Sequence, residues 1–157
     1  MIVYFVIVVA SVAAVMDAKT YRIPNWLTFG SILVGFILNF HLTGFTGLLA
    51  SFWGFVIGGF ALLPFFMLGG MGAGDVKLIA GFGALGGPLF AMNTLLTGSI
   101  LGGVAALLIL VRKYGCKDFF ARLFLLIKFK GTQEGSVLPY GVFLSAGALL
   151  SCFWGVF

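Results

Sequence analysis

Long stretches without charge constrain this sequence more than any other feature. Of its 157 residues, 62% are hydrophobic and only 8% are charged, so polar side chains cannot cover a fold of this size. Apolar residues form six runs, at 1–18, 26–42, 48–68, 77–92, 94–111 and 137–157. Each run is close to the roughly 17–25 residues that a helix needs to cross a bilayer. The sequence therefore predicts an all-α integral membrane protein with six transmembrane helices and one membrane-embedded domain, residues 1–157.

Glycine, proline and polar residues mark the predicted breaks between these helices. The breaks fall at 21–25, 39–47, 69–74, near 92–93, and across 112–136. The glycine-rich break at 69–74 is the sharpest, whereas only Asn93 and Thr94 mark the break between the fourth and fifth helices. Glycine pairs at GxxxG spacing predict close helix packing within the subunit. These pairs are Gly54 with Gly58, Gly83 with Gly87, and Gly98 with Gly102.

Charged residues all fall on one side of the predicted helices. The nine basic residues are Lys19, Arg22, Lys77, Arg112, Lys113, Lys117, Arg122, Lys128 and Lys130. The positive-inside rule makes this side cytoplasmic and places both termini outside, leaving Asn39 and His41 among the few polar residues of the outer loops. Basic residues of such a protein contact anionic membrane lipids, so nucleic acid is not an expected partner.

Residues 118–129 could form a further helix on the cytoplasmic side. Asp118 and Arg122 are spaced to pair along one helix face, and apolar residues separate them. Two arrangements remain open for this segment, because its polar face is interrupted by Leu125 and Phe129. It either lies along the membrane interface or packs against the helix bundle.

Two aspartates interrupt the apolar pattern where the first run ends and the fourth begins. Asp17 closes a helix that runs inward, and Asp75 opens a helix that runs outward, so both carboxylates lie at the cytoplasmic depth. An ionisable group at such a place is costly unless it is paired or hydrated. Two neighbouring carboxyl groups can share a proton and hold a water molecule as a nucleophile, as in aspartic proteases. Asp17 and Asp75 are therefore the candidate catalytic residues.

Three residues near Asp75 are candidate substrate-binding or supporting residues. Gly72 and Gly74 lack a Cβ atom, so the chain there can turn tightly, tolerate positive φ and let a substrate backbone approach closely. Lys77 either assists the carboxylates or extends its ammonium group to the interface. Asn25 is the expected N-cap of the second helix.

A purely structural alternative assigns the aspartates to helix ends. In that case Asp17 pairs with Lys19 or Arg22, while Asp75 caps its helix and pairs with Lys77. No ligand cluster suggests a metal or other cofactor, and Cys116 and Cys152 form no CxxC pair.

Two segments resemble the type IV prepilin peptidases, which are GxGD-type aspartic proteases of the inner membrane. They are DAKTYRIPN at 17–25 and GAGDVKL at 72–78, in the family's order, and PYG at 139–141 resembles a third feature. The resemblance implies that Asp17 and Asp75 form a catalytic dyad. It implies a multi-pass protein of the cytoplasmic membrane that removes the basic leader of a prepilin or pseudopilin on the cytoplasmic side.

The short chain is similar to the enzymes that serve Flp-type pili, and the archaeal preflagellin peptidases are similar in size. Bifunctional members of this family carry a cytoplasmic segment with two CxxC pairs. This sequence shows no such segment, so N-methylation is not expected of this chain. Pilus assembly machinery is a further expected partner. Two other classes stay open: a small proton or cation transporter, and a structural subunit of a pilus or secretion machine.

Overall fold

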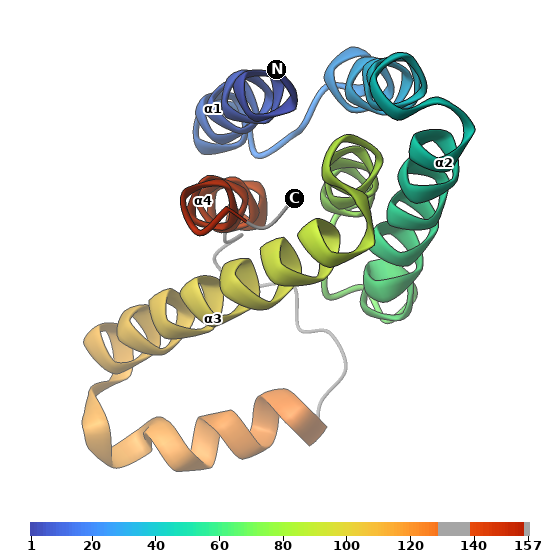
Figure 1. The fold of residues 1–157 in the computed structure, drawn as a ribbon. Coiled ribbons are helices and arrows are strands. Elements are labelled where there is room, and N and C mark those ends of the chain that lie inside the picture. Colours follow the sequence, from blue (N-terminus) through green and yellow to red (C-terminus); the bar gives the residue numbers. More distant parts are fainter. Residues whose placement is uncertain (129–138, 156–157) are drawn as a thin grey trace.

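The described part of the chain is helical throughout. The computed structural model describes residues 1–128 and 139–155, and it describes their side chains except at 110 and 113–128. Four helices follow one another: α1 (Ile2–Thr20), α2 (Asn25–Met67), α3 (Ala73–Lys128) and α4 (Tyr140–Phe153) (Figure 1). The all-α prediction is confirmed for these residues.

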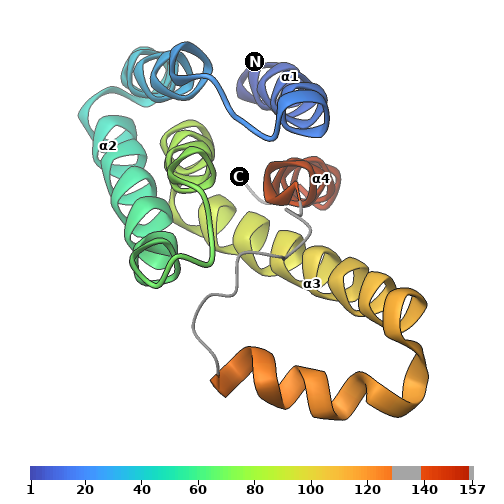
Figure 2. The ribbon, with the colours of Figure 1, turned by 180° about the vertical axis from the view of Figure 1, so that it is seen from behind.

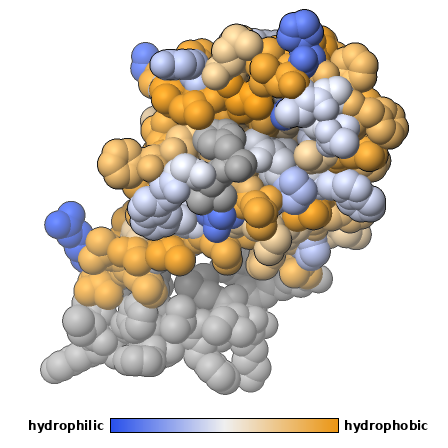
Figure 3. All heavy atoms as spheres, viewed as in Figure 1, coloured by the Kyte–Doolittle hydropathy of each residue, from blue (hydrophilic) through white to orange (hydrophobic). Residues whose placement is uncertain are grey.

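Three stretches are long and apolar enough to cross a membrane, judged by length and composition. They are Ile2–Thr20, Asn25–Met67 and Ala73–Ile109, and α4 is a shorter apolar helix. Many large apolar side chains point outward from them, including Trp26, Phe60 and Leu89, and apolar residues cover much of the face in Figure 3. Such a surface suits contact with lipid better than contact with water.

The second half of α2 runs antiparallel to the start of α3. At Gly44 the backbone leaves the helical region, with φ 67° and ψ −143°. Beyond it, Gly54 packs directly against the backbone of Gly83, and Gly58 faces Ile79, where an added Cβ atom would lie 2.7 Å from the carbonyl oxygen. The GxxxG prediction of close packing is confirmed for Gly54 and Gly58.

The first half of α2 packs against the same part of α3 but runs in the other direction. Ser31 packs directly against Gly81, and a Cβ atom on Gly35 would lie 2.6 Å from the carbonyl carbon of Ala84. From the first contact to the second, the residue numbers increase along both helices, so this half of α2 runs parallel to the start of α3. The chain therefore reverses direction at Gly44, inside the predicted break at 39–47, and the predicted spans 26–42 and 48–68 form the two legs of α2.

A second reversal lies inside α3, at Gly87 and Pro88. Gly87 adopts φ 82°, a conformation that only glycine takes without strain. Pro88 has no N–H group to donate to the carbonyl oxygen of Ala84. Two side chains of α2 supply donors instead: Asn39 Nδ2 lies 3.1 Å from this oxygen, and Ser51 Oγ also bonds to it. A freed carbonyl is thus satisfied inside the bundle, as a hydrocarbon environment requires.

The predicted break near Met92 and Asn93 is wrong, because the backbone there is helical and the chain turns at Gly87 instead. Thr94, which marked the expected break, is fully buried. Because Gly87 lies in this turn, the predicted pair of Gly83 and Gly87 does not share one face of a regular helix. The interpretation of Asn39 as an outer-loop residue is wrong too, since it lies within α2 and bonds to α3.

The second leg of α3 packs antiparallel to α4. A Cβ atom on Gly147 would lie 2.6 Å from the backbone nitrogen of Gly98 and 2.7 Å from the carbonyl oxygen of Thr94, whereas one on Gly102 would lie 3.6 Å from Phe143. Figures 1 and 2 show α4 between α1 and this leg. With the reversals in α2 and α3, the described bundle has six legs that alternate in direction.

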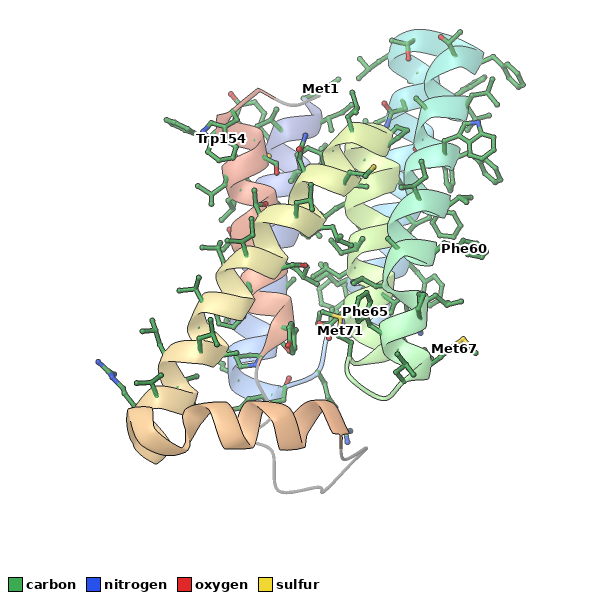
Figure 4. All side chains as sticks on the ribbon, turned by 90° about the horizontal axis from the view of Figure 1, so that it is seen from below. Met1, Phe60, Phe65, Met67, Met71 and Trp154 are labelled. Atoms are coloured by element: carbon green, nitrogen blue, oxygen red, sulfur yellow. The ribbon has the colours of Figure 1, made fainter. Side chains whose placement is uncertain are left out.

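One end of the bundle gathers the end of α1 and the beginnings of α3 and α4. Figure 4 shows Met1 and Trp154 at the opposite end, and Met67 and Met71 toward this one. The last part of α3 crosses this end of the bundle (Figure 4), and it is helical to Lys128, close to the predicted 118–129. The predicted pairing of Asp118 with Arg122 lies outside the described side chains.

Candidate active site

Asp17 lies in the last turn of α1 and is almost fully buried, with 4% of its surface exposed. The helix ends just beyond it, because Tyr21 adopts the left-handed conformation (φ 52°) and donates its N–H to the Asp17 carbonyl oxygen at 2.9 Å. The carboxylate faces the start of α4, where the backbone N–H of Val142 lies 3.2 Å from Asp17 Oδ2. A residue far along the chain therefore holds this carboxylate.

Asp75 is the third residue of α3, and 8% of its surface is exposed. Its Oδ2 atom accepts the backbone N–H of Gly72 at 3.2 Å, and its own N–H lies 3.1 Å from the Gly72 carbonyl oxygen. The bond from the Gly72 N–H to the Asp75 carboxylate is one half of a capping box, in which the side chain of the third helical residue accepts the N–H of the residue before the helix. Asp75 therefore stabilises the start of its helix from inside the first turn, and not from the N-cap position that the structural alternative implied.

Gly72 and Gly74 were expected to tolerate positive φ, but neither adopts it in the structure. Gly69, not Gly72 or Gly74, has positive φ (76°), and it ends α2 as helix-terminating glycines commonly do. Gly72 supplies the N–H group that binds Asp75. Gly74 lies close to Ile23, whose Cβ atom would be 3.2 Å from a Cβ atom on this glycine. The approach of a substrate backbone to these glycines stays a prediction.

The fold brings the two carboxyl groups to the same site. Gly74, which precedes Asp75, and Gly141, which lies against Asp17 Oδ2, both contact Ile23. Ile23, in the link between α1 and α2, touches both helix starts: a Cβ atom on Gly74 would lie 3.2 Å from Ile23 Cβ, and one on Gly141 would lie 2.7 Å from Ile23 Cδ1. Asp75 is thus carried by α3 and Asp17 by α1, and Ile23 contacts the start of α3 and the start of α4, the helix that lies against the Asp17 carboxylate.

Lys77 lies at the edge of this site and bonds to a different partner. Its ammonium group donates to Asn25 Oδ1 at 3.0 Å and lies 5.2 Å from the centre of the Phe29 ring. Among the described side chains, neither aspartate forms an ion pair with a basic residue, so the ion-pair part of the structural alternative is wrong for them. The N-cap of α2 is Pro24 rather than Asn25, whose side chain is engaged by Lys77 instead.

Three residues of the site were missed in the sequence: Ile23, Gly141 and Val142. A Cβ atom on Gly141 would lie 2.9 Å from Asp17 Oδ2, so only glycine lets α4 approach this carboxylate so closely. The PYG motif gave a signal at Gly141, but it did not indicate the partner. Within the part of the chain that the structure describes, no three His, Cys, Asp or Glu side chains gather as metal ligands would.

This arrangement suits acid–base chemistry on a bound water. Two buried carboxyl groups in proximity can share one proton, so that one acts as a base and the other as an acid. Each of the two also accepts a backbone N–H group, which fixes its orientation. The described residues thus form a helical bundle in which two buried aspartates lie toward one end, one in the last turn of α1 and one in the first turn of α3.

Comparison with known proteins assigns the family. Residues 4–107 match the model of the type IV leader peptidase family. This match covers well over half of the chain and includes both aspartates, so the protein belongs to the type IV leader peptidase family. The resemblance found in the sequence motifs is confirmed.

Curated relatives are similar over nearly the whole chain. The chain is 26% identical over 149 residues to the prepilin leader peptidase/N-methyltransferase of Pseudomonas aeruginosa and 27% identical over 150 residues to that of Stutzerimonas stutzeri. It is 29% identical over 149 residues to that of Legionella pneumophila. The matches cover 89–90% of this chain but only 45% of each relative, so the chain spans about half their length. No solved structure matches it.

Proposed function

We propose that this protein is an aspartic endopeptidase that removes the basic leader peptide of type IV prepilins, with Asp17 and Asp75 as its catalytic residues. The observation that carries this proposal is the meeting of two buried carboxyl groups from α1 and α3. Membership of the leader peptidase family supports it, and so does the order of the two motifs along the chain. No cofactor is needed for this chemistry.

The reaction follows from a pair of carboxyl groups that holds one proton. The ionised carboxylate removes a proton from a bound water, whose oxygen attacks the carbonyl carbon of the scissile peptide. The protonated carboxyl gives its proton to the carbonyl oxygen. The tetrahedral intermediate then collapses and the C–N bond breaks. The leaving nitrogen takes the proton that the base had accepted, and the hydroxyl group that becomes the new carbonyl returns its proton to the carboxylate that had acted as the acid. Both groups return to their starting state, and water has been added across the bond.

The proposed setting is the cytoplasmic face of the inner membrane. The six alternating legs and the apolar outer surface support six membrane crossings, and the one-sided basic residues support the orientation. A prepilin has a basic leader followed by an apolar helix, so it can lie in the bilayer with its cleavage site at the depth of Asp17 and Asp75. The proposed substrates are Flp-type prepilins, and pilus assembly machinery is the proposed partner.

Gly72, Gly74 and Lys77 have supporting roles in this proposal. The N–H of Gly72 orients the Asp75 carboxylate. Gly74 lets α3 approach the α1–α2 link. Lys77 holds the start of α3 against the start of α2 through Asn25, with its ammonium group beside the Phe29 ring.

Cleavage of a defined substrate by the purified protein tests the function. The wild-type protein, in detergent or in liposomes, is incubated with an Flp-type prepilin that has a basic leader, a glycine before the cleavage site and an apolar helix. Mass spectrometry is expected to show one cut after the glycine. A prepilin with its leader lysines changed to glutamates controls for charge recognition, and a pseudopilin controls for substrate class. Proton uptake into liposomes without cleavage of any substrate would favour a transporter and contradict the proposal.

A further inference from the structure

Ile23 fills the space between the starts of α3 and α4. Its side chain is buried, with 9% of its surface exposed, although it lies in the short link that joins α1 to α2. A Cβ atom on Gly74 would lie 3.2 Å from Ile23 Cβ and 3.6 Å from Ile23 Cγ1. At the far end of the same side chain, a Cβ atom on Gly141 would lie 2.7 Å from Ile23 Cδ1. A side chain in place of either glycine would therefore require Ile23 to shift.

The two glycines that Ile23 touches are each adjacent to a group of the carboxylate pair. Gly74 directly precedes Asp75 in the chain. Gly141 lies against the Asp17 carboxylate, and the next residue donates its N–H to that carboxylate. Moving the start of α3 relative to Ile23 would therefore move Asp75, and moving the start of α4 would move the N–H group that holds the Asp17 carboxylate.

We propose that Ile23 is a positioning residue that sets the separation of the Asp17 and Asp75 carboxyl groups by holding the starts of α3 and α4 apart. Its Cβ and Cγ1 atoms contact Gly74 near the start of α3, and its Cδ1 atom contacts Gly141 near the start of α4. Its effect on catalysis rests on the proposed function, whereas its effect on spacing does not. Proteins are densely packed, so an added or missing methyl group at such a contact shifts its neighbours.

Two substitutions separate the contacts that Ile23 makes. Ile23→Val keeps the Cβ and both γ carbons beside Gly74 and removes only Cδ1, the atom beside Gly141. Ile23→Ala also removes the γ carbons. Ile79→Val and Ile79→Ala delete the same atoms from an isoleucine of α3 that is fully buried and packs against Gly58 of α2. They are the matched controls for packing loss.

Steady-state cleavage of a prepilin is the first readout. We expect Ile23→Val to lower kcat about tenfold and Ile23→Ala about 10²-fold, with little change in KM, because small misplacement of catalytic groups is costly. The Ile79 variants lower the thermal midpoint at least as much but keep kcat near wild type. Equal losses of kcat for the Ile23 and Ile79 variants at matched stability would overturn the proposal.

Spacing is measured without substrate by a pair of spin labels. The labels are placed at positions 70 and 140, just before α3 and at the first residue of α4, in a chain whose Cys116 and Cys152 are changed to Ser. We expect Ile23→Ala to shift or broaden the distance distribution and Ile79→Ala to leave it unchanged. An unchanged distribution in Ile23→Ala would refute the positioning role. A wild-type protein that cleaves no prepilin would refute the proposed function but leave this measurement decisive.

Discussion

Gly141→Ala is expected to disable the site while leaving the fold intact. The new Cβ atom would lie 2.9 Å from Asp17 Oδ2, 3.0 Å from Asp17 Cγ and 2.7 Å from Ile23 Cδ1. Carbon atoms in contact prefer separations of about 3.5–4.0 Å, so these groups must move by roughly 0.5–1 Å. All three atoms are at side-chain ends, which rotate away at small cost in stability. Displacing a catalytic group by about 1 Å can lower activity by about 10²-fold, which is the loss of kcat that we expect.

The assay compares kcat for prepilin cleavage with the thermal midpoint of the same purified sample. Gly102→Ala is the matched control, because it also lies between α3 and α4, but its Cβ atom would meet Phe143 at an ordinary 3.6 Å. We expect the control to cleave at the wild-type rate. Wild-type kcat in Gly141→Ala would refute the inferred approach of α4 to Asp17. A loss of folded protein in Gly141→Ala, with normal kcat per folded molecule, would refute it as well.

Other predictions concern the bundle and its orientation. Gly35→Ala is expected to destabilise the protein by about 1–3 kcal/mol in a denaturant titration, since its Cβ atom would meet α3 backbone at 2.6 Å, which cannot rotate away. Gly30→Ala, with nothing within 4 Å, is its control and should not destabilise. Asn39→Leu removes one of the two side-chain donors to the carbonyl freed by Pro88 and should cost about 1 kcal/mol in the same titration; an unchanged midpoint would contradict the bond's role. Single cysteines should be labelled from the cytoplasm at positions 20, 73 and 115 and from outside at position 44, and external labelling at 73 would overturn the orientation. Metal chelators should leave cleavage unchanged, and clear inhibition would contradict a purely aspartic mechanism.

Hydropathy predicted the helices well because each apolar run is long and the breaks at 21–25 and 69–74 contain proline or glycine. It misplaced the turn in α3 because Gly87 and Pro88 lie among apolar residues, where a hydropathy pattern has no minimum. Asn93 and Thr94 were polar enough to indicate a loop, yet the helix continues through them and Thr94 is buried. Polar residues inside a bundle and polar residues of a loop look the same in one sequence.

The meeting of Asp17 and Asp75 was predictable because alternating helices bring the end of the first and the start of the fourth to one side. Contacts between distant parts of the chain were not. Lys77 bonds to Asn25, 52 positions away, and Val142 bonds to Asp17, 125 positions away. Periodicity and motif spacing describe neighbours along the chain, so they could not indicate that Ile23 fits between two helix starts.

Separate Asp17→Asn and Asp75→Asn variants test the carboxylate pair most directly. Asparagine keeps the shape of the side chain but can neither accept nor release the catalytic proton, and loss of general acid–base catalysis costs about 10²–10⁴-fold. Asp118→Asn, which removes an aspartate outside both motifs, is the control. Initial rates of prepilin cleavage should fall by at least that range in each of the first two variants and stay at the wild-type value in the control. Wild-type cleavage by either Asp17→Asn or Asp75→Asn would contradict a catalytic dyad.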